Sequence, residues 1–259
     1  MHILIDIGNS TIAIAMTNND GEITNVWRFK TLKDETVSFF RYELKAGIKK
    51  YEIETKDIDT ITISSVVPEI NDYIAQAIKD ITGIAPHFFN LNDALQKINL
   101  DIDLPAALGK DRLADAVGAA VCHGVPAIII DMGTATTVGV VNEDNTFIGG
   151  MIIPGVKTSL KALSKKASQL PMVNIEQPEH IIGRNTLECM QSGVLYGNAA
   201  MVDGIIDRIR PTLKGDVHVI ATGGMAKSII PFCHNEVVID ECLQFKGLFH
   251  ATHNLSVHS

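Results

Sequence analysis

The sequence predicts an α/β protein with two similar domains, each built on a mixed five-stranded sheet flanked by helices. The main observation is an internal repeat: residues 3–11, ILIDIGNST, return as IIIDMGTAT at residues 128–136. In both copies an aliphatic run typical of a buried strand leads to Asp, and the Gly two residues later permits a sharp turn. The length of 259 residues also suits two domains. We therefore expect domains over residues 1–114 and 115–259.

The first half opens with three expected strands and continues with alternating helices and strands. Residues 18–21, Asn-Asn-Asp-Gly, are a hairpin signal between the second and third strands. Val37, Phe40, Leu44 and Ile48 recur at helical spacing and predict an amphipathic helix. The expected strands cover residues 2–8, 11–17, 22–30, 58–64 and 86–89, and the expected helices cover residues 34–49 and 68–82.

The second half repeats this plan after an Ala-rich helix. Residues 143–145, Glu-Asp-Asn, take the place of the first hairpin turn. A further helix is expected directly after residues 222–224, Thr-Gly-Gly, and the polar tail at residues 252–259 is expected to fray. The expected strands cover residues 127–131, 136–142, 147–153 and 217–221, and the expected helices cover residues 113–122, 154–167, 185–209 and 241–251.

The composition argues against several classes of protein. A formal net charge of −8 argues against a nucleic-acid partner, because phosphate backbones require a basic surface. No apolar run approaches the roughly 20 residues that span a bilayer. The N-terminus enters a strand without the features of a signal peptide. Cys122, Cys189, Cys233 and Cys242 lack paired spacing and are expected to be reduced thiols. We therefore expect a cytoplasmic protein with no membrane or nucleic-acid partner.

The two Asp-x-Gly turns carry the strongest functional signal. After Asp6 and Asp131, a Gly lets backbone N–H groups approach an anion closely, and hydroxyl side chains follow. Such a pair suits the phosphates of a nucleotide in a cleft between two domains, and a carboxylate at a strand end can hold Mg²⁺ through water. Each turn also has a purely structural interpretation. Asp6 and Thr11 could simply complete a hairpin, and Asp131 could cap the N–H groups of its own turn.

Residues 109–112, Gly-Lys-Asp-Arg, precede the Ala-rich helix and form a second candidate site. Asp111 could accept a proton from a substrate hydroxyl, while Arg112 binds a carboxylate or phosphate. Alternatively, Asp111 could be a helix cap, and Arg112 could form a surface ion pair that contributes little to stability. The Thr-Gly-Gly turn at residues 222–224 suits a phosphate or an adenosine edge, but a plain turn explains it as well. Residues 150–158 are not a Walker A loop, because Lys does not directly follow the second Gly.

Taken together, these motifs resemble a known family. Paired Asp-x-Gly turns mark the superfamily of acetate kinase, sugar kinases, heat-shock ATPases and actin. Within it, residues 6–11 (DIGNST), 109–112 (GKDR), 131–137 (DMGTATT) and 149–155 (GGMIIPG) resemble type III pantothenate kinases. The resemblance covers nearly the whole chain and implies two actin-like (ribonuclease H-like) domains with a nucleotide cleft between them. It implies a homodimer that uses ATP to phosphorylate pantothenate to 4'-phosphopantothenate, the first step of coenzyme A biosynthesis.

The resemblance also implies roles for individual residues. Asp111 would accept the proton of the substrate hydroxyl. Asp131 would hold a monovalent cation, K⁺ or NH₄⁺, and Asp6 would hold Mg²⁺ through water. The residues expected to bind ATP are Asp6, Ile7, Gly8, Asn9, Ser10, Thr11, Ile12, Ala13 and Thr134. The residues expected to bind pantothenate are Gly109, Lys110, Asp111, Arg112 and Thr186, the last of them across the homodimer interface.

Two positions depart from the family pattern, and other functions stay open. Ser10 stands where the family usually has Thr, and Ile102 replaces a Tyr that contacts substrate in many relatives. The alternatives are another small-molecule kinase or a polyphosphate hydrolase of the same superfamily, and a non-catalytic regulatory relative. A filament-forming nucleotide switch is a further alternative, for which the chain is short.

Overall fold

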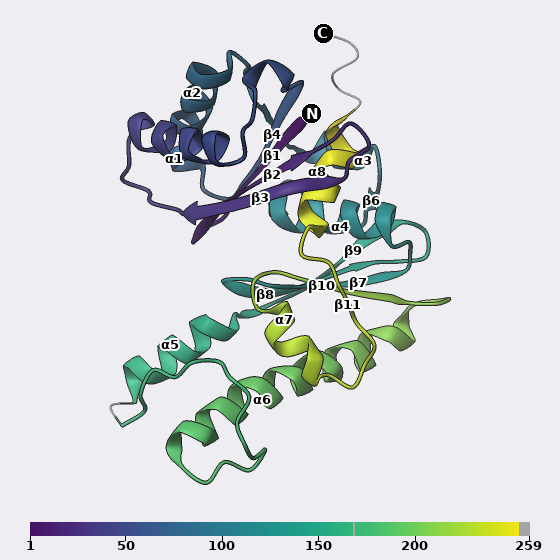
Figure 1. Cartoon of the computed structure of the whole chain (residues 1–259). Coiled ribbons are helices and arrows are strands. Elements are labelled where there is room, and N and C mark those ends of the chain that lie inside the picture. The colour runs from purple at the N-terminus through teal and green to yellow at the C-terminus, as the bar shows by residue number, and fades with distance from the viewer. Residues whose placement is uncertain (168, 254–259) are drawn as a thin grey trace. The chain divides into compact units, whose positions relative to one another are not determined.

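The computed structural model describes residues 1–167 and 169–253, and these residues form two units. The first unit consists of residues 1–122 together with the C-terminal segment from residue 242, and the second consists of residues 123–241. Each unit has a mixed sheet with helices packed against it (Figure 1). Among the described residues, no helix is long and apolar enough to cross a membrane.

The sheet of the first unit has five strands in the order β3-β2-β1-β4-β5. β1 pairs antiparallel with β2 and parallel with β4, β2 pairs antiparallel with β3, and β4 pairs parallel with β5. β1 is buried along almost its whole length, as expected for a nearly continuous apolar run covered on both faces. The strands are β1 (His2–Ile7), β2 (Thr11–Thr17), β3 (Ile23–Lys30), β4 (Thr60–Ser65) and β5 (His87–Phe88).

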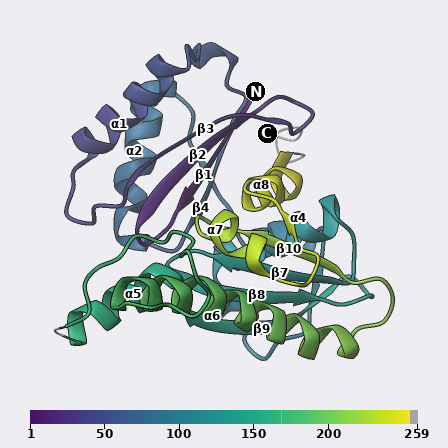
Figure 2. The same cartoon turned by 60° about the horizontal axis from the view of Figure 1, so that its bottom comes forward.

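Two pairs of helices pack against this sheet. α1 (Val37–Lys50) and α2 (Asn71–Thr82) lie side by side and share one apolar core with β1, β2 and β4 (Figure 1). α4 (Lys110–Cys122) and α8 (Leu243–Thr252) pack against each other and contact β4, and α8 also contacts β1 (Figure 2). The short elements of this unit are α3 (Leu91–Leu95), β6 (Asn99–Leu100) and the 3-10 turns Thr55–Asp57, Pro68–Ile70 and Pro105–Ala107.

The strands of the second unit follow the order β11-β10-β7-β8-β9. β7 pairs antiparallel with β8 and parallel with β10, β8 pairs antiparallel with β9, and β10 pairs parallel with β11. The long helix α6 packs its buried residues into one core with β7, β8, β10 and α7 (Figure 2). The elements are β7 (Ala127–Met132), β8 (Ala135–Val141), β9 (Thr146–Pro154), α5 (Val156–Lys166), α6 (Thr186–Ile209), β10 (His218–Thr222), α7 (Ala226–Ile229), β11 (Val238–Ile239), and the 3-10 turns Arg210–Thr212 and Ile230–Phe232.

The two sheets share one topology, which confirms the α/β fold predicted from the repeat. β3-β2-β1-β4-β5 corresponds strand by strand to β9-β8-β7-β10-β11, with the same relative directions. Asp6 and Asp131 each occupy the next-to-last position of the first strand of their unit. A register shift also occurs at matching places, at Met16/Thr17 and at Val140/Val141. The repeated sequence therefore folds into a repeated structure.

The observed division into units differs from the expected boundary between residues 114 and 115. α4 is one continuous helix that lies wholly in the first unit, so the expected boundary would cut through it. α8 is the last helix of the described residues and was expected in the second domain, but it belongs to the first unit because it packs on α4, β1 and β4. The periodicity of a helix shows which face is apolar but not which surface covers that face.

Most expected elements are confirmed to within one or two residues. α4 begins at Lys110 and not at residue 113, so that Asp111 is helical. Pro154 ends β9 and does not begin α5. The short elements α3, β6 and β11 were not expected, because two to five residues carry little periodic signal. Of the tail expected to fray, Thr252 ends α8, and residues 254–259 lie outside the described part of the chain.

Candidate active site

The first Asp-x-Gly turn is a tight connection between β1 and β2. The N–H group of Gly8 donates to the carbonyl of Thr11 at 3.1 Å, and a Cβ at residue 8 would lie 3.1 Å from that oxygen. Thr31, just after β3, stabilises the turn from the side. Its hydroxyl donates to the carbonyl of Gly8 at 2.6 Å, and its N–H group donates to the carbonyl of Ser10 at 3.2 Å. No local pattern predicts this role for Thr31, because its partners lie about twenty residues earlier.

The residues of this turn differ in exposure. Asp6 is half-buried, and its Oδ1 accepts a hydrogen bond from Nε2 of Gln244 at 2.7 Å. The exposed residues are Asn9, Ser10 and Thr11, whereas Ile7, Ile12 and Ala13 are buried. Three polar side chains are thus presented to solvent next to a strand-end carboxylate. The buried residues could contact a nucleotide through their backbone atoms.

The second Asp-x-Gly turn repeats this geometry. The N–H group of Gly133 donates to the carbonyl of Ala135 at 3.0 Å, and Thr134 is exposed. The carbonyl of Thr134 accepts from the N–H group of Gly155 at 3.2 Å and from the hydroxyl of Thr158 at 2.7 Å. A side chain on Gly155 would overlap the backbone oxygens of Gly133 and Thr134, so only glycine allows this close approach.

The Thr-Gly-Gly turn after β10 also packs on the second turn. Gly223 has φ +85, and a Cβ there would overlap Oδ1 of Asp131 and crowd the backbone of Met132. The N–H group of Met225 donates to the carbonyl of Met132 at 3.1 Å. Segments that the sequence analysis singled out separately, around Gly155 and Gly223, therefore meet at the Asp131 turn.

Asp111 and Arg112 are both half-buried in the first turn of α4. Oδ1 of Asp111 accepts the backbone N–H of Arg112 at 2.8 Å, and a Cβ on Gly109 would overlap the same oxygen. Oδ1 is therefore engaged within the first turn of the helix. Burial lowers the pKa of the Arg112 guanidinium, although the negative charges of Asp111 and Asp115 act to raise it. Its ordinary pKa is so high that the group stays charged at neutral pH.

Ile102 and Thr186, the other two positions that the family resemblance relates to substrate, lie outside the Gly109–Arg112 motif. Ile102 is half-buried in the loop before the Pro105–Ala107 turn. Thr186 is exposed and begins α6, where the side chain of Asn185 accepts the N–H group of Glu188 at 2.9 Å. The carboxylate of Glu188 accepts the N–H group of Arg184, which is the main reason that the pKa of Glu188 is lowered. Thr186 is thus held at a well-capped helix start.

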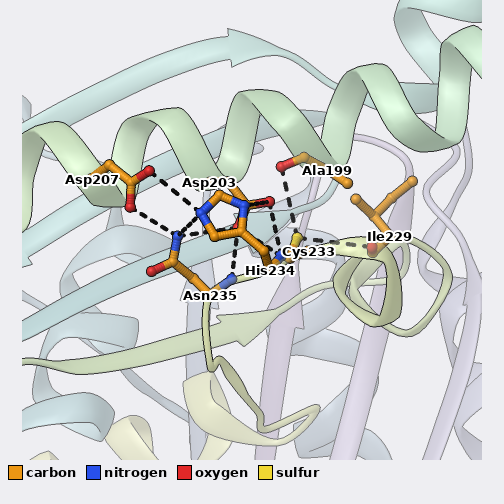
Figure 3. Close-up of polar contacts among 7 residues, drawn as sticks. All are labelled: Ala199, Asp203, Asp207, Ile229, Cys233, His234 and Asn235. Atoms are coloured by element: carbon orange, nitrogen blue, oxygen red, sulfur yellow. Dashed lines mark hydrogen bonds and ion pairs between the residues drawn. The ribbon is translucent and has the colours of Figure 1, made fainter.

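A buried carboxylate near the other end of α6 holds the loop that leads to β11 (Figure 3). Asp203 accepts the backbone N–H groups of His234 and Asn235 at 3.0 Å, and it forms an ion pair with Nδ1 of His234 at 2.9 Å. Burial alone would raise the pKa of Asp203, but these hydrogen bonds outweigh it, so the pKa is lowered. Burial and the Asp203 charge together raise the pKa of Cys233 to about 12.

We expect Asp203→Asn to lower the free energy of unfolding by about 2 kcal/mol at pH 7, because two part-buried backbone donors lose a charged acceptor. The lowered pKa means that Asp203 stabilises the fold fully above its unfolded-state pKa of about 4, and that this contribution is lost as the pH falls further. Urea unfolding at several pH values should show the difference between the two proteins shrinking below pH 4. Asp207→Asn, at an exposed neighbour, should change stability by less than about 0.5 kcal/mol. A difference that stays constant with pH would contradict this account.

Solved structures of other proteins show the same fold. A Baf family transcriptional activator from Campylobacter jejuni has a TM-score of 0.59 and 18% identity, with 98% of each chain covered. The activator of 2-hydroxyisocaproyl-CoA dehydratase from Clostridium difficile, with bound ADPNP, has a TM-score of 0.56 and 14% identity, with 98% of this chain and 94% of that chain covered. Identities this low show the fold alone.

Two matching sheets, each with an Asp-x-Gly turn after its first strand, define a protein with the actin-like α/β fold. The sequence profile of the type III pantothenate kinases matches residues 2–208. A type III pantothenate kinase from Halalkalibacterium halodurans is 35% identical over 248 residues, which cover 96% of this chain and 97% of that protein. The chain belongs to the type III pantothenate kinase family.

Proposed function

We propose that this chain transfers the γ-phosphoryl group of ATP to the hydroxyl of pantothenate, in the cytoplasm, as the first step of coenzyme A biosynthesis. The observation that carries the proposal is family membership over most of the chain, together with the Gly109–Arg112 motif at the start of α4. The fold by itself is shared with regulators and ATPases, so it does not select this reaction.

The Asp-x-Gly turn of each unit binds phosphate oxygens of ATP. The exposed side chains of Asn9, Ser10, Thr11 and Thr134 support this, because hydroxyl and amide groups donate hydrogen bonds to phosphate oxygens. Gly8 and Gly133 support it as well, since residues without a Cβ let a ligand approach the backbone. Ser10 offers the same hydroxyl donor as the Thr usual in the family, so this departure preserves the chemistry.

The donor types at both strand ends fit the expected cations. Asp6 offers a half-buried carboxylate beside exposed hydroxyls, which suits a hydrated Mg²⁺. Asp131 offers carboxylate oxygens next to residues 133 and 223, which are both glycines and carry no side chain. Oxygen ligands of this kind suit K⁺ or NH₄⁺. Bound cations supply positive charge that offsets the charge on the transferring phosphoryl group. The protein groups would orient the substrates around that charge.

Asp111 accepts the proton of the pantothenate hydroxyl as that oxygen attacks in line. The hydrogen bond from Arg112 and the absence of a side chain on Gly109 hold the Asp111 carboxylate in one orientation. The charged Arg112 guanidinium binds the carboxylate of pantothenate, with the Gly109–Lys110 backbone beside it. Most of the rate enhancement then comes from positioning and charge stabilisation. Ile102 presents an apolar wall where many relatives have Tyr.

A second copy of the chain completes the site, with Thr186 acting on the substrate of its partner. The support is a set of large apolar side chains exposed on the second unit, on β9, α5, the segment before α6, and the first turn of α6. Monomeric proteins rarely leave such surface uncovered. The exposed residues are Ile148, Met151, Ile152, Leu163, Met172, Ile181, Ile182 and Leu187.

Co-expression of Asp111→Asn and Thr186→Val chains should restore activity that neither variant has alone. A mixed dimer would contain one site with both changes and one site with neither. Random pairing makes half of the dimers mixed, so about one quarter of the wild-type activity per chain is expected for a symmetric shared site. Light scattering should give the mass of two chains. A co-expressed sample as inactive as its parents would place Thr186 and Asp111 of one site on the same chain, and a Thr186→Val variant as active as the wild type would remove Thr186 from the mechanism.

The reaction itself is tested by coupled measurement of ADP release with ATP, Mg²⁺, K⁺ and pantothenate. Release that requires pantothenate, and that falls when Na⁺ replaces K⁺, supports the proposal. ADP release with water as the sole acceptor would identify a hydrolase instead. Nucleotide binding without turnover on pantothenate or any other small alcohol would favour a regulatory relative.

A further inference from the structure

The last helix of the described chain reaches the candidate phosphate site. Gln244 lies in the first turn of α8, two residues after the chain returns to the first unit. Its part-buried side-chain amide donates from Nε2 to Oδ1 of Asp6 at 2.7 Å, across 238 positions of sequence. Nothing in the local sequence pattern predicts this contact.

Backbone contacts determine where the Gln244 side chain lies. A Cβ on Gly247 would overlap the carbonyl oxygen of Ala114, and a Cβ on Gly118 would overlap that of Leu243, so α8 and α4 touch backbone to backbone. At its other end, α8 is anchored by a buried hydrogen bond of 3.0 Å between the hydroxyls of Thr252 and Thr62. α8 is thus held by α4, which carries Asp111, and by β4, which pairs with the strand that carries Asp6.

A neutral amide is well suited to orient a carboxylate. The N–H donor restricts rotation of the Asp6 carboxylate, and unlike Lys or Arg it leaves the negative charge available to a cation. Partners of this kind, one bond away from a metal ligand, commonly change metal affinity by about 10- to 100-fold when they are removed.

We propose that Gln244 is a positioning residue that orients the Asp6 carboxylate toward the Mg²⁺ that accompanies ATP. The inference rests on the proposed function and adds to it a residue from the far end of the chain. Because α8 also packs on α4, the same helix sets the placement of Asp6 relative to Asp111 within the first unit.

The test compares the affinity for a non-hydrolysable ATP analogue, by calorimetry, with Mg²⁺ and with EDTA. Gln244→Met keeps the length and helix propensity of the side chain but removes the donor. In this variant the gain in affinity that Mg²⁺ provides should shrink by about 10- to 100-fold. Affinity without metal should stay close to the wild-type value. In turnover assays, the Mg²⁺ concentration for half-maximal rate should rise, while KM for pantothenate should change little.

Two further variants separate positioning from general damage. Gln76→Leu removes a bond of the same kind and length, from Nε2 to Oδ1 of Asp80 on the exposed face of α2, and should leave the effect of Mg²⁺ unchanged. Thr252→Val loosens the other end of α8 while Gln244 remains, and should lower thermal stability without changing the effect of Mg²⁺.

Several results would overturn the proposal. One is an unchanged Mg²⁺ effect in Gln244→Met; another is an equal loss of affinity with and without metal. If Gln244→Met does not fold, Gln244→Leu also removes the donor with an apolar side chain of high helix propensity, and it should show the same loss of the Mg²⁺ effect. If wild-type protein itself fails to bind the analogue, the proposed kinase function fails, whereas normal wild-type binding with unaffected variants rejects Gln244 alone.

Discussion

Asp111→Asn should lower kcat by about 100- to 10,000-fold, the range usual for loss of a positioned proton acceptor. The change is nearly isosteric, and the amide oxygen can still accept the N–H group of Arg112, so the first turn of α4 should persist. The affinity for an ATP analogue should therefore stay close to the wild-type value. Pantothenate-dependent ADP release gives kcat, and calorimetry gives the affinity.

Asp103→Asn is the matched control for this prediction. Asp103 is exposed in the loop ahead of α4, so the same loss of charge should leave kcat unchanged. An Asp111→Asn enzyme with near-normal turnover would remove Asp111 from the mechanism. Loss of both turnover and nucleotide binding would instead indicate that Asp111 mainly supports the structure of this region.

Gly247→Ala should lower the free energy of unfolding by about 2–4 kcal/mol, because overpacking and the backbone shift that relieves it are costly. The added methyl group would overlap the carbonyl oxygen of Ala114, and backbone cannot move aside as a flexible side chain can. α8 would have to separate from α4, which also loosens the Gln244–Asp6 hydrogen bond. Urea unfolding followed by circular dichroism measures the stability, and the variant should also lose turnover.

Gly204→Ala provides the control in another helix. A Cβ there would meet only Nη1 of Arg208, the movable end of a long side chain, at 2.9 Å. The change should be neutral or should stabilise the protein by up to about 1 kcal/mol, since Ala favours helix over Gly. If Gly247→Ala were as stable as the wild type, α4 and α8 would not be in the close contact described.

Prediction from sequence succeeded where neighbouring residues determine the structure. The aliphatic runs before Asp6 and Asp131 fold as buried strands, and the Gly two positions later makes the tight turn in each copy. The apolar spacing from Val37 to Ile48 gives α1. The roles of Asp111, Asp131 and Thr186 stay predictions, which the experiments above are designed to test.

Prediction was less successful where distant segments meet. Thr31 lies within hydrogen-bonding distance of Gly8, and Gly223 lies against Asp131, although neither pair is close in sequence. The division into units differs from the expected boundary for the same reason, since the periodicity of α8 does not show that its partner is α4. A contact between distant segments depends on how all the intervening elements pack.

The sequence by itself determined the repeated strand–turn plan, the chemistry available at each turn, and the family of the protein. These follow from hydrophobic periodicity and from residue types at fixed short spacing, both of which are local properties. Only the tertiary structure decided that the C-terminal helix returns to the first unit and brings Gln244 to Asp6. That result depends on the close approach of Gly247 to Ala114, because backbone-to-backbone packing is a property of the folded chain as a whole.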